Sequence, residues 1–262
     1  MRDESRSLLE LAEDHLAYVE IGPDEERIVD PRFVVLCTPG RHFWSAGVGR
    51  VRFDADIDAP LAEIRSLVRA RGYEAAVWTL GSHASPSDIV DELGARGLEL
   101  EGTSDTLVLT RAPSRAAADD LDVRTVRTLE DHVASIEVAA EGFGWPLADR
   151  RDALASAEAS FRAEQDGKHT ARLLAWDGGR PVATGRAWLA PTGVYVGGGA
   201  TLPSDRRRGA MTSLLLAAWD DAVRRGTPAV VTYGGSMSSP ILVGLGFEKV
   251  GEVSHMIDRL HD

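Results

Sequence analysis

The strongest constraint on the fold of this chain lies in residues 200–216, ATLPSDRRRGAMTSLLL. An apolar strand here leads through a basic turn into an amphipathic helix. The first N–H groups of a helix have no intrahelical partner, and the positive end of the helix dipole lies beside them. Gly209 lacks a Cβ, so a ligand can approach the backbone closely at this point. The segment therefore predicts a site for an anion such as a phosphate.

The three arginines of this turn, residues 206–208, also have a simpler interpretation. A run of like charges usually marks an exposed, solvated surface. The helix behind it is well defined, because apolar residues recur at helical spacing and Gly226 provides a stop. These apolar residues are Met211, Leu214, Leu215, Ala218, Trp219 and Ala222. The order of the surrounding elements must decide between an exposed turn and a ligand site.

Composition excludes several classes of protein. The 262 residues are 44% hydrophobic, which is typical of a globular chain, and no apolar run has membrane-spanning length. The net charge of −12 argues against nucleic-acid binding. Cys37, the single cysteine, lies in the apolar run FVVLC and is interpreted as buried; a disulfide framework within the chain is excluded. The charged N-terminus is unlike a signal peptide, so we expect a cytoplasmic protein without membrane, nucleic-acid or metal partners.

A small, polar segment divides the chain. Residues 110–121, TRAPSRAAADDL, are typical of a linker and separate a unit of residues 1–113 from one of residues 114–262. The second unit is predicted to have the order β-α-α-β-β-β-α-β-α-β. Its strands are expected at residues 121–128, 171–176, 181–189, 194–202, 229–233 and 250–260, and its helices at 129–141, 148–165, 210–225 and 239–245, with a turn at Asp166 and Gly167.

The first unit appears as a degenerate copy of the second. Residues 67–110 align with residues 221–260 as helix end, apolar strand, serine and proline residues, short helix, glycine turn and final strand. Upstream, a strand at 45–53 and a helix at 61–70 flank the turn DADIDAP, residues 54–60. This acidic turn would repel a pyrophosphate. The alternative is a coincidence between two common strand-helix-strand units.

At this point the second unit resembles the GNAT superfamily of N-acyltransferases. Arg206, Gly209 and, imperfectly, Met211 match the Arg/Gln-x-x-Gly-x-Gly/Ala signature, and Leu245, Gly246 and Phe247 match the family's leucine-glycine-phenylalanine ending. The resemblance implies an α/β fold of the α+β type with two GNAT-like units. Each unit would have a mixed, mostly antiparallel sheet flanked by helices, and the fourth and fifth strands of the C-terminal unit would be splayed.

The resemblance also implies acetyl-CoA as co-substrate and the transfer of its acetyl group to a primary amine by direct attack in a ternary complex. The acceptor would be a small molecule or a peptide. The backbone of β-edge residues would pair with pantetheine, and the turn would hold the pyrophosphate. These cofactor-binding residues are Gly199, Ala200, Thr201, Arg206, Arg207, Arg208, Gly209, Ala210, Met211 and Thr212.

Two departures concern the chemistry. Leu242 stands where many family members have the tyrosine that protonates the leaving thiolate, and the strand at 194–202 has no carboxylate. Tyr233, Ser238 and Ser239 are therefore the catalytic candidates, although a serine before a helix is also a common cap and Tyr233 also fits a core position. A non-catalytic acyl-CoA-binding module is the alternative function.

The acceptor pocket of this family lies between the first two helices and the sheet. The resemblance therefore points to Glu137, Glu141, Phe143 and Trp145 as acceptor-binding residues. The two related units predict a pseudo-dimer within one chain, as a monomer or a homodimer, and we expect the N-terminal unit to shape the acceptor cleft.

Overall fold

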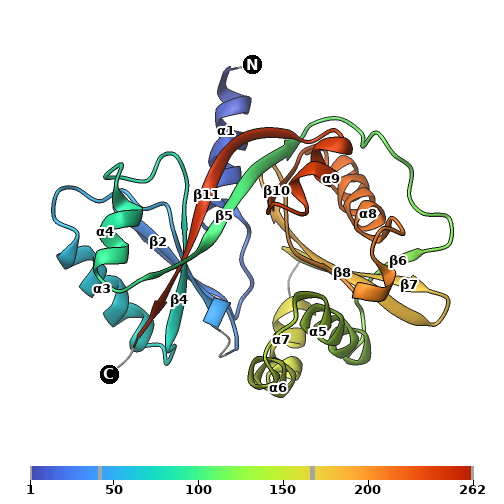
Figure 1. The fold of residues 1–262 in the computed structure, drawn as a ribbon, viewed down its shortest axis with the longest axis horizontal. Coiled ribbons are helices and arrows are strands. Elements are labelled where there is room, and N and C mark those ends of the chain that lie inside the picture. The colour runs from blue at the N-terminus through green and yellow to red at the C-terminus, as the bar shows by residue number, and fades with distance from the viewer. Residues whose placement is uncertain (1, 41–42, 166–168, 261–262) are drawn as a thin grey trace.

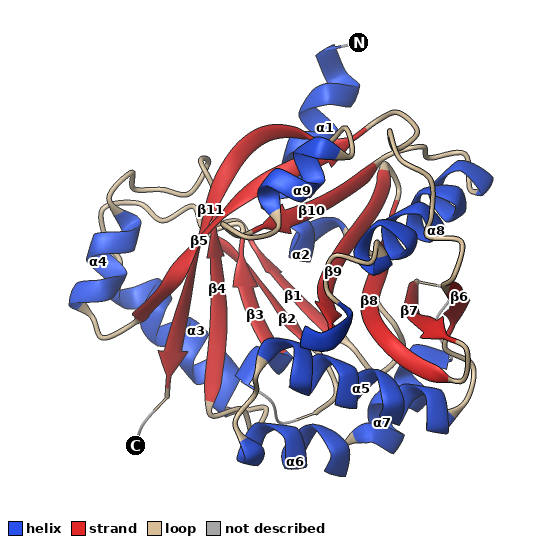
Figure 2. Ribbon diagram, turned by 45° about the vertical axis from the view of Figure 1, so that its right-hand side comes forward, coloured by secondary structure: helices blue, strands red, loops and turns tan. Residues whose placement is uncertain are grey.

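A computed structural model describes residues 2–40, 43–165 and 169–260, and the turn predicted at Asp166 and Gly167 lies outside these residues. Its described strands form one mixed sheet in the order β1-β2-β3-β4-β11-β5-β10-β9-β8-β7-β6 (Figure 1). Helices pack on both faces of this sheet (Figure 2). The predicted fold class is thereby confirmed, with the two sheets joined into one.

The elements follow one another along the chain in two similar series. The strands are β1 (Glu26–Asp30), β2 (Phe33–Cys37), β3 (Ala46–Gly49), β4 (Ala75–Leu80), β5 (Glu99–Leu109), β6 (Asp122–Thr125), β7 (Thr170–Asp177), β8 (Arg180–Ala190), β9 (Gly193–Thr201), β10 (Val230–Gly234) and β11 (Glu248–Arg259). The α-helices are α1 (Arg2–Glu13), α2 (His15–Tyr18), α3 (Asp58–Arg69), α4 (Ile89–Ala95), α5 (Leu129–Phe143), α6 (Leu147–Ala155), α7 (Ala157–Gln165), α8 (Ala210–Arg224) and α9 (Ser239–Gly244), and short 3-10 turns are η1 (Phe43–Ser45) and η2 (Pro203–Asp205).

The repeat predicted from the sequence is visible in the element order. The series β3-α3-β4-α4-β5 corresponds to β9-α8-β10-α9-β11, and the pairs β3–β4 and β9–β10 are both parallel. The last strand of each series, however, is exchanged. Strand β5 lies between β10 and β11, whereas β11 lies between β4 and β5. The division at residues 113 and 114 remains a prediction, because the central pairing of the sheet joins residues from both sides of it.

Separate apolar clusters lie under the helices. One lies between α8, α9 and the sheet and includes Leu214, Leu215 and Ala218, as the helical spacing predicted. A second lies under α3 and α4 and includes Cys37, and a third lies under α1. Burial raises the pKa of the Cys37 thiol to about 11, which fits a core residue better than a nucleophile.

Several predicted elements have different bounds. The single helix predicted at 148–165 is two helices, α6 and α7, which meet at Ser156. The Ser156 hydroxyl donates to the carbonyls of Asp152 and Ala153, a local bond that competes with a continuous helix. The strand predicted at 45–53 ends at Gly49, because Arg50 has a φ of +49°. Helices α1 and α2 were not predicted.

No helix among the described residues is long and apolar enough to cross a membrane.

Candidate active site

Strands β9 and β10 separate midway along their length. They pair in parallel only from Val194 to Val196 on β9, and β9 then continues through its glycine run without β10. Gly198 has a φ of +61°, and the register between β8 and β9 shifts at this point. The other edge of β9 stays paired, because Ala200 and Thr201 face Thr184 and Ala183 on β8. The predicted splayed pair is therefore present, with the backbone edge of β9 directed into the opening.

The basic turn follows directly. Arg207 and Gly209 both have left-handed backbone conformations, with φ of +67° and +87°, and α8 begins at Ala210. The backbone N–H of Ser213 donates to the Gly209 carbonyl at 2.9 Å, which is the first hydrogen bond of the helix. The N–H groups of Ala210, Met211 and Thr212 lie in the first turn before this bond, so they have no partner within the helix. This arrangement fits the predicted phosphate-binding turn.

The three arginines of the turn have different surroundings. Arg208 contacts the carboxylates of Asp120, Asp177 and Asp205 at 2.6, 2.7 and 2.8 Å, so its side chain braces the turn. Arg206 donates to the carbonyl of Gly142 at the end of α5. Arg207 is exposed, and the structure of the described residues shows no ion pair for it. Arg207 is therefore the guanidinium best placed for a ligand.

A second interaction fixes the turn from below. Both terminal nitrogens of the Arg180 guanidinium donate hydrogen bonds to the carboxylate of Asp205, at 2.7 and 3.0 Å. Arg180 first, and then the hydroxyl of Ser204, hold the pKa of Asp205 well below its usual range. The buried carboxylate thus stays charged and keeps the turn in place.

Met211, where the family signature has a small residue, packs against the splayed strand. A Cβ built on Gly199 would lie 2.8 Å from Cε of Met211. A Cβ on Gly142 would lie 2.9 Å from that of Ala200. Glycine at 199 therefore makes room for the larger side chain at 211, and glycine at 142 lets α5 approach the end of β9.

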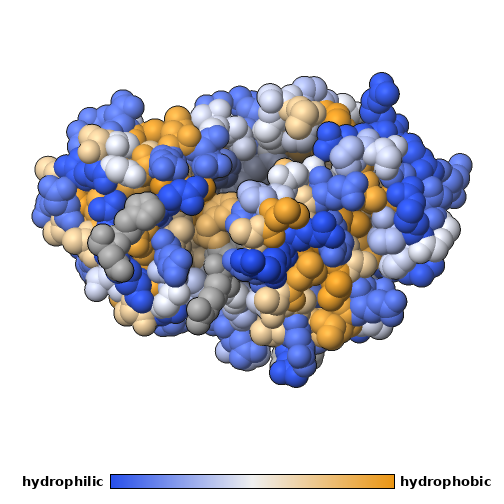
Figure 3. Space-filling view, turned by 60° about the horizontal axis from the view of Figure 1, so that its bottom comes forward, coloured by the Kyte–Doolittle hydropathy of each residue, from blue (hydrophilic) through white to orange (hydrophobic). Residues whose placement is uncertain are grey.

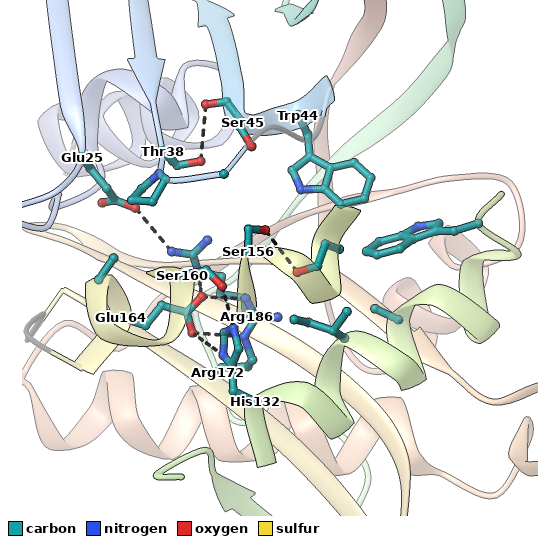
Figure 4. Close-up of a pocket in the computed structure, with 17 residues that line it drawn as sticks. Glu25, Thr38, Trp44, Ser45, His132, Ser156, Ser160, Glu164, Arg172 and Arg186 are labelled. Carbon is teal, nitrogen blue, oxygen red and sulfur yellow. Dashed lines mark hydrogen bonds and ion pairs between the residues drawn. The ribbon is translucent and has the colours of Figure 1, made fainter. Parts of the chain in front are cut away.

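A cavity of about 120 Å³ lies beside the splay, between the two halves of the chain (Figure 4). The N-terminal half contributes Glu25, Thr38, Pro39, Gly40, Trp44 and Ser45, and the C-terminal half contributes residues of α5, α6, α7, β7 and β8. The surrounding face of the molecule is hollowed in the space-filling view (Figure 3). Arg186 on the cavity floor is the cross-strand partner of Gly197 at the start of the splay. The cavity therefore lies one strand from the opening in β9.

Two buried ion pairs form the cavity floor. Arg172 on β7 holds Glu164 on α7 with two bonds of 2.6 and 3.1 Å. Arg186 on β8 contacts Glu25 at 3.4 Å. Burial alone would raise the pKa of Glu164, but Arg172 and Arg186 outweigh it and lower that pKa to about 2. The floor thus carries two positive and two negative charges.

His132 on α5 completes the floor. Its side chain is fully buried, and its Nε2 lies 2.8 Å from the hydroxyl of Ser160. Its Nδ1 has no hydrogen-bond partner in the described part of the chain and lies 3.6 Å from Oε2 of Glu164. Burial lowers the pKa of His132 to about 4, so the ring is neutral near pH 7.

The structure brings only one of the four predicted acceptor-binding residues into the cavity. Trp145 lines it and contacts Trp44 at 4.5 Å between ring centroids. Phe143 is half exposed and Glu141 is exposed, whereas Glu137 forms an ion pair with Arg150 on α6. The face of α5 toward the cavity consists of His132, Ile136 and Ala139, with helical spacing. Acceptor binding by the four predicted residues remains a prediction.

The charged cavity floor was not predicted from the sequence. Arg172 and Arg186 lie on predicted strands, and a charge at an inward position of a strand was the available signal. Glu164 lies only eight residues before Arg172 but on a helix, whereas Glu25 is 161 residues from Arg186 and belongs to the other half. No local pattern connects the four.

The three predicted proton donors are held in different ways. The hydroxyl of Tyr233 lies 3.0 Å from Nδ1 of His15 and 3.3 Å from the carbonyl of Glu13, and burial raises the pKa of this tyrosine well above its usual value. Ser239 donates to the carboxylate of Asp105 on β5, which also pairs with Lys249.

Ser238 is the least engaged of the three, with one long contact of 3.4 Å to the carbonyl of Gly235. The strand exchange has placed Asp105, from the N-terminal half, beside this candidate site. The catalytic roles of all three residues remain predictions. Among the described residues, no group of three or more histidine, cysteine or acidic side chains could hold a metal ion.

Comparisons with solved structures show the same fold. A GCN5-related N-acetyltransferase from Kribbella flavida superimposes with a TM-score of 0.65 at 19% identity, covering 98% of this chain and 94% of its own. A GCN5-related N-acetyltransferase from Sphaerobacter thermophilus gives 0.56 at 16% identity, covering 89% and 83%. A tandem GNAT protein from the clavulanic acid biosynthesis pathway gives 0.54 at 14% identity, covering 92% and 85%. No protein-family model and no curated protein matches the chain. The chain therefore has the GNAT fold in a tandem arrangement.

Proposed function

We propose that this chain, with its tandem GNAT fold, is an acyl-CoA-dependent N-acetyltransferase that transfers the acetyl group of acetyl-CoA to a primary amine. One observation supports this more than any other. The splay between β9 and β10 opens toward the free helix start of α8 at one end and lies one strand from a polar cavity at the other. The two substrates would thus meet at the glycine run.

The residues of the site support two parts of acyl transfer, the binding of the cofactor and the polarisation of its carbonyl. The reaction needs a neutral amine, a polarised thioester carbonyl and a proton for the leaving sulfur. The open edge of β9 offers backbone N–H groups for pantetheine and for the carbonyl oxygen. The first turn of α8 and Arg207 would hold the pyrophosphate. Attack of the amine nitrogen on the carbonyl carbon would break the C–S bond in a ternary complex, without an acyl-enzyme.

The proton donor is the open part of this mechanism. Ser238 is the hydroxyl with the fewest other bonds, whereas Ser239 is bonded to Asp105. The hydroxyls of Ser239 and Tyr233 already have partners, and Leu242 stands where the family has a tyrosine; both observations favour one alternative function. In it, the chain binds acyl-CoA without turning it over.

Two measurements separate these functions. Calorimetry with acetyl-CoA tests binding, and release of free CoA thiol with a panel of primary amines tests turnover. We expect binding at one site and turnover with at least one amine. Ser238→Ala should lower kcat and leave the acetyl-CoA Kd unchanged, whereas Ser236→Ala, at an exposed neighbour, should change neither. Binding without turnover would support the non-catalytic alternative, and absence of binding would contradict both.

A further inference from the structure

The far corner of the cavity contains a polar atom that has no hydrogen-bond partner among the described residues. His132 lines the cavity, and its buried Nδ1 lies 3.6 Å from Oε2 of Glu164, which is beyond hydrogen-bond distance (Figure 4). Buried polar atoms in folded proteins nearly always have a partner, and one without a partner signals a ligand or a bound water. This corner is therefore built to receive a further group.

The bonds of His132 show what that group must provide. The Ser160 hydroxyl is 3.1 Å from the carbonyl of Ala157 and 2.8 Å from Nε2 of His132. If Ser160 donates to the carbonyl, Nε2 carries the imidazole proton and Nδ1 is an acceptor. Nδ1 and the carboxylate of Glu164 are then two acceptors facing each other. A nitrogen with two N–H donors, placed to one side of the pair at about 2.9 Å from each atom, satisfies both.

The charges around this corner favour an uncharged group. Arg172 offsets Glu164, and Arg186 offsets Glu25, at a site where all four side chains are largely buried. An added ammonium would lie near two guanidinium groups, and an added carboxylate near two carboxylates. Either would lose its hydration without a free counter-charge. The guanidinium groups can still donate to a carbonyl oxygen.

Position distinguishes this corner from the reacting centre. Arg186 on β8 faces Gly197 at the splay, whereas Glu164 is bound to Arg172 on β7, one strand farther away. Strands are about 4.8 Å apart, so the corner lies roughly 10 Å from β9. A flexible chain of about five carbons spans this distance.

Resting on the proposed function, we propose that His132 and Glu164 form a specificity subsite for a primary carboxamide carried by the acceptor at the opposite end from its reacting amine. The amide NH₂ donates to Nδ1 of His132 and to Glu164, and the amide oxygen accepts from the arginines of the floor. The rings of Trp44 and Trp145 contact each other and line another side of the same cavity. The N-terminal half thus takes part in acceptor recognition.

A matched set of amines tests this subsite. The four probes are δ-aminovaleramide, δ-aminovalerate, cadaverine and pentylamine, which share a five-carbon chain and end in carboxamide, carboxylate, ammonium and methyl. Their kcat/KM values are measured with acetyl-CoA by thiol release. We expect the amide to exceed each of the others by about tenfold or more, because the carboxylate and methyl probes offer no N–H donors to the buried acceptors and the ammonium finds no free counter-charge.

Two variants assign that preference to His132. His132→Phe removes the acceptor, so the advantage of the amide over pentylamine should fall to about twofold or less. His132→Asn keeps an acceptor near the position of Nδ1 and should retain most of the preference. Thermal unfolding and the acetyl-CoA Kd, measured for each variant, show whether it is folded.

The outcomes separate failure of the subsite from failure of the proposed function. Equal kcat/KM for all four amines, as expected if a water fills the gap, would overturn the subsite while leaving acetyl transfer intact. If no amine is turned over, calorimetry of the wild type with δ-aminovaleramide and with pentylamine still tests whether the subsite binds the amide. Tighter binding of the amide that is lost in His132→Phe supports the subsite, and equal binding overturns it.

Discussion

The gap between the parallel strands is open in the C-terminal half of the chain and closed in the N-terminal half. In the C-terminal half, β9 leaves β10 after Val196, and no backbone hydrogen bond between described residues closes the gap. In the N-terminal half, the chain after β3 stays attached to the segment after β4. Arg52 bridges Ser85, the N–H of Phe53 donates to the Ser85 carbonyl, and the Ser85 hydroxyl donates back to Phe53. The space that is open in one half is closed by hydrogen bonds in the other.

Side chains reinforce the difference. Val51 and Phe53 are buried in the N-terminal core, and Phe53 packs edge to face on Trp78 at 6.3 Å. The start of α3 has Ile57 and Asp58 where α8 has Gly209 and Ala210. A bulky cap and an acidic first turn do not favour a phosphate. The same element order can therefore leave an opening or form a core, depending on a few residues beside the gap.

The largest expected effect comes from separating the halves. Residues 114–262 alone would lack β5, which pairs with β10 and β11, and β4, which pairs with β11. We expect no cooperative thermal transition by circular dichroism, because two central strands would expose unpaired backbone. Co-expression with residues 1–113 should restore it. A fragment that folds alone and binds acetyl-CoA like the full chain would show that the halves are independent.

A core substitution tests whether the N-terminal gap is only a filled version of the C-terminal one. Phe53→Ala should lower the free energy of unfolding by about 3–5 kcal/mol, because it removes a buried aromatic ring from a packed gap. Denaturant titration measures this loss. Calorimetry should still find one acetyl-CoA site with an unchanged Kd, because the acidic turn remains. A second site would show that Phe53 alone closes the gap.

The glycine turn allows a matched pair of variants. Gly209→Val should weaken acetyl-CoA binding by at least tenfold, roughly 1.4 kcal/mol, because it strains a φ of +87° and its Cβ would lie 3.2 Å from that of Ala118. Gly97→Val places the same residue at a φ of +92° in the N-terminal half, with open space around it. It should lower stability and leave the Kd unchanged. Equal Kd for both variants would contradict a ligand role for the C-terminal turn.

The smallest effect concerns the arginines of the turn. Arg207→Ala should weaken acetyl-CoA binding by about fivefold, which is what an exposed charge worth about 1 kcal/mol provides, and added salt should reduce the difference. Its melting temperature should match the wild type. Arg208→Ala should instead lower the melting temperature, because Asp120, Asp177 and Asp205 lose a shared partner. The reverse result would exchange the roles given to the two arginines.

Much of the fold was readable because it depends on local spacing. Helix α8 buries Leu214, Leu215 and Ala218, as the helical period predicted. The basic turn before α8 and the acidic turn before α3 were visible in the sequence, and so was the order of elements shared by the halves. The residues of α5 that line the cavity were harder to predict, because the helical period does not say which face of α5 meets the cavity. Glu137 and Glu141 lie on other faces.

By itself, the sequence determined the strand, turn and helix of the predicted anion site, the two related halves and the absence of the basic turn from one of them. The tertiary structure alone decided that β5 and β11 exchange places, that Arg208 braces while Arg207 is exposed, and that Glu25 meets Arg186 in a cavity shared by both halves. The physical reason is that periodicity fixes which face of an element is buried, whereas strands with the same alternation can pair with several partners. Only packing of the whole chain selects among them.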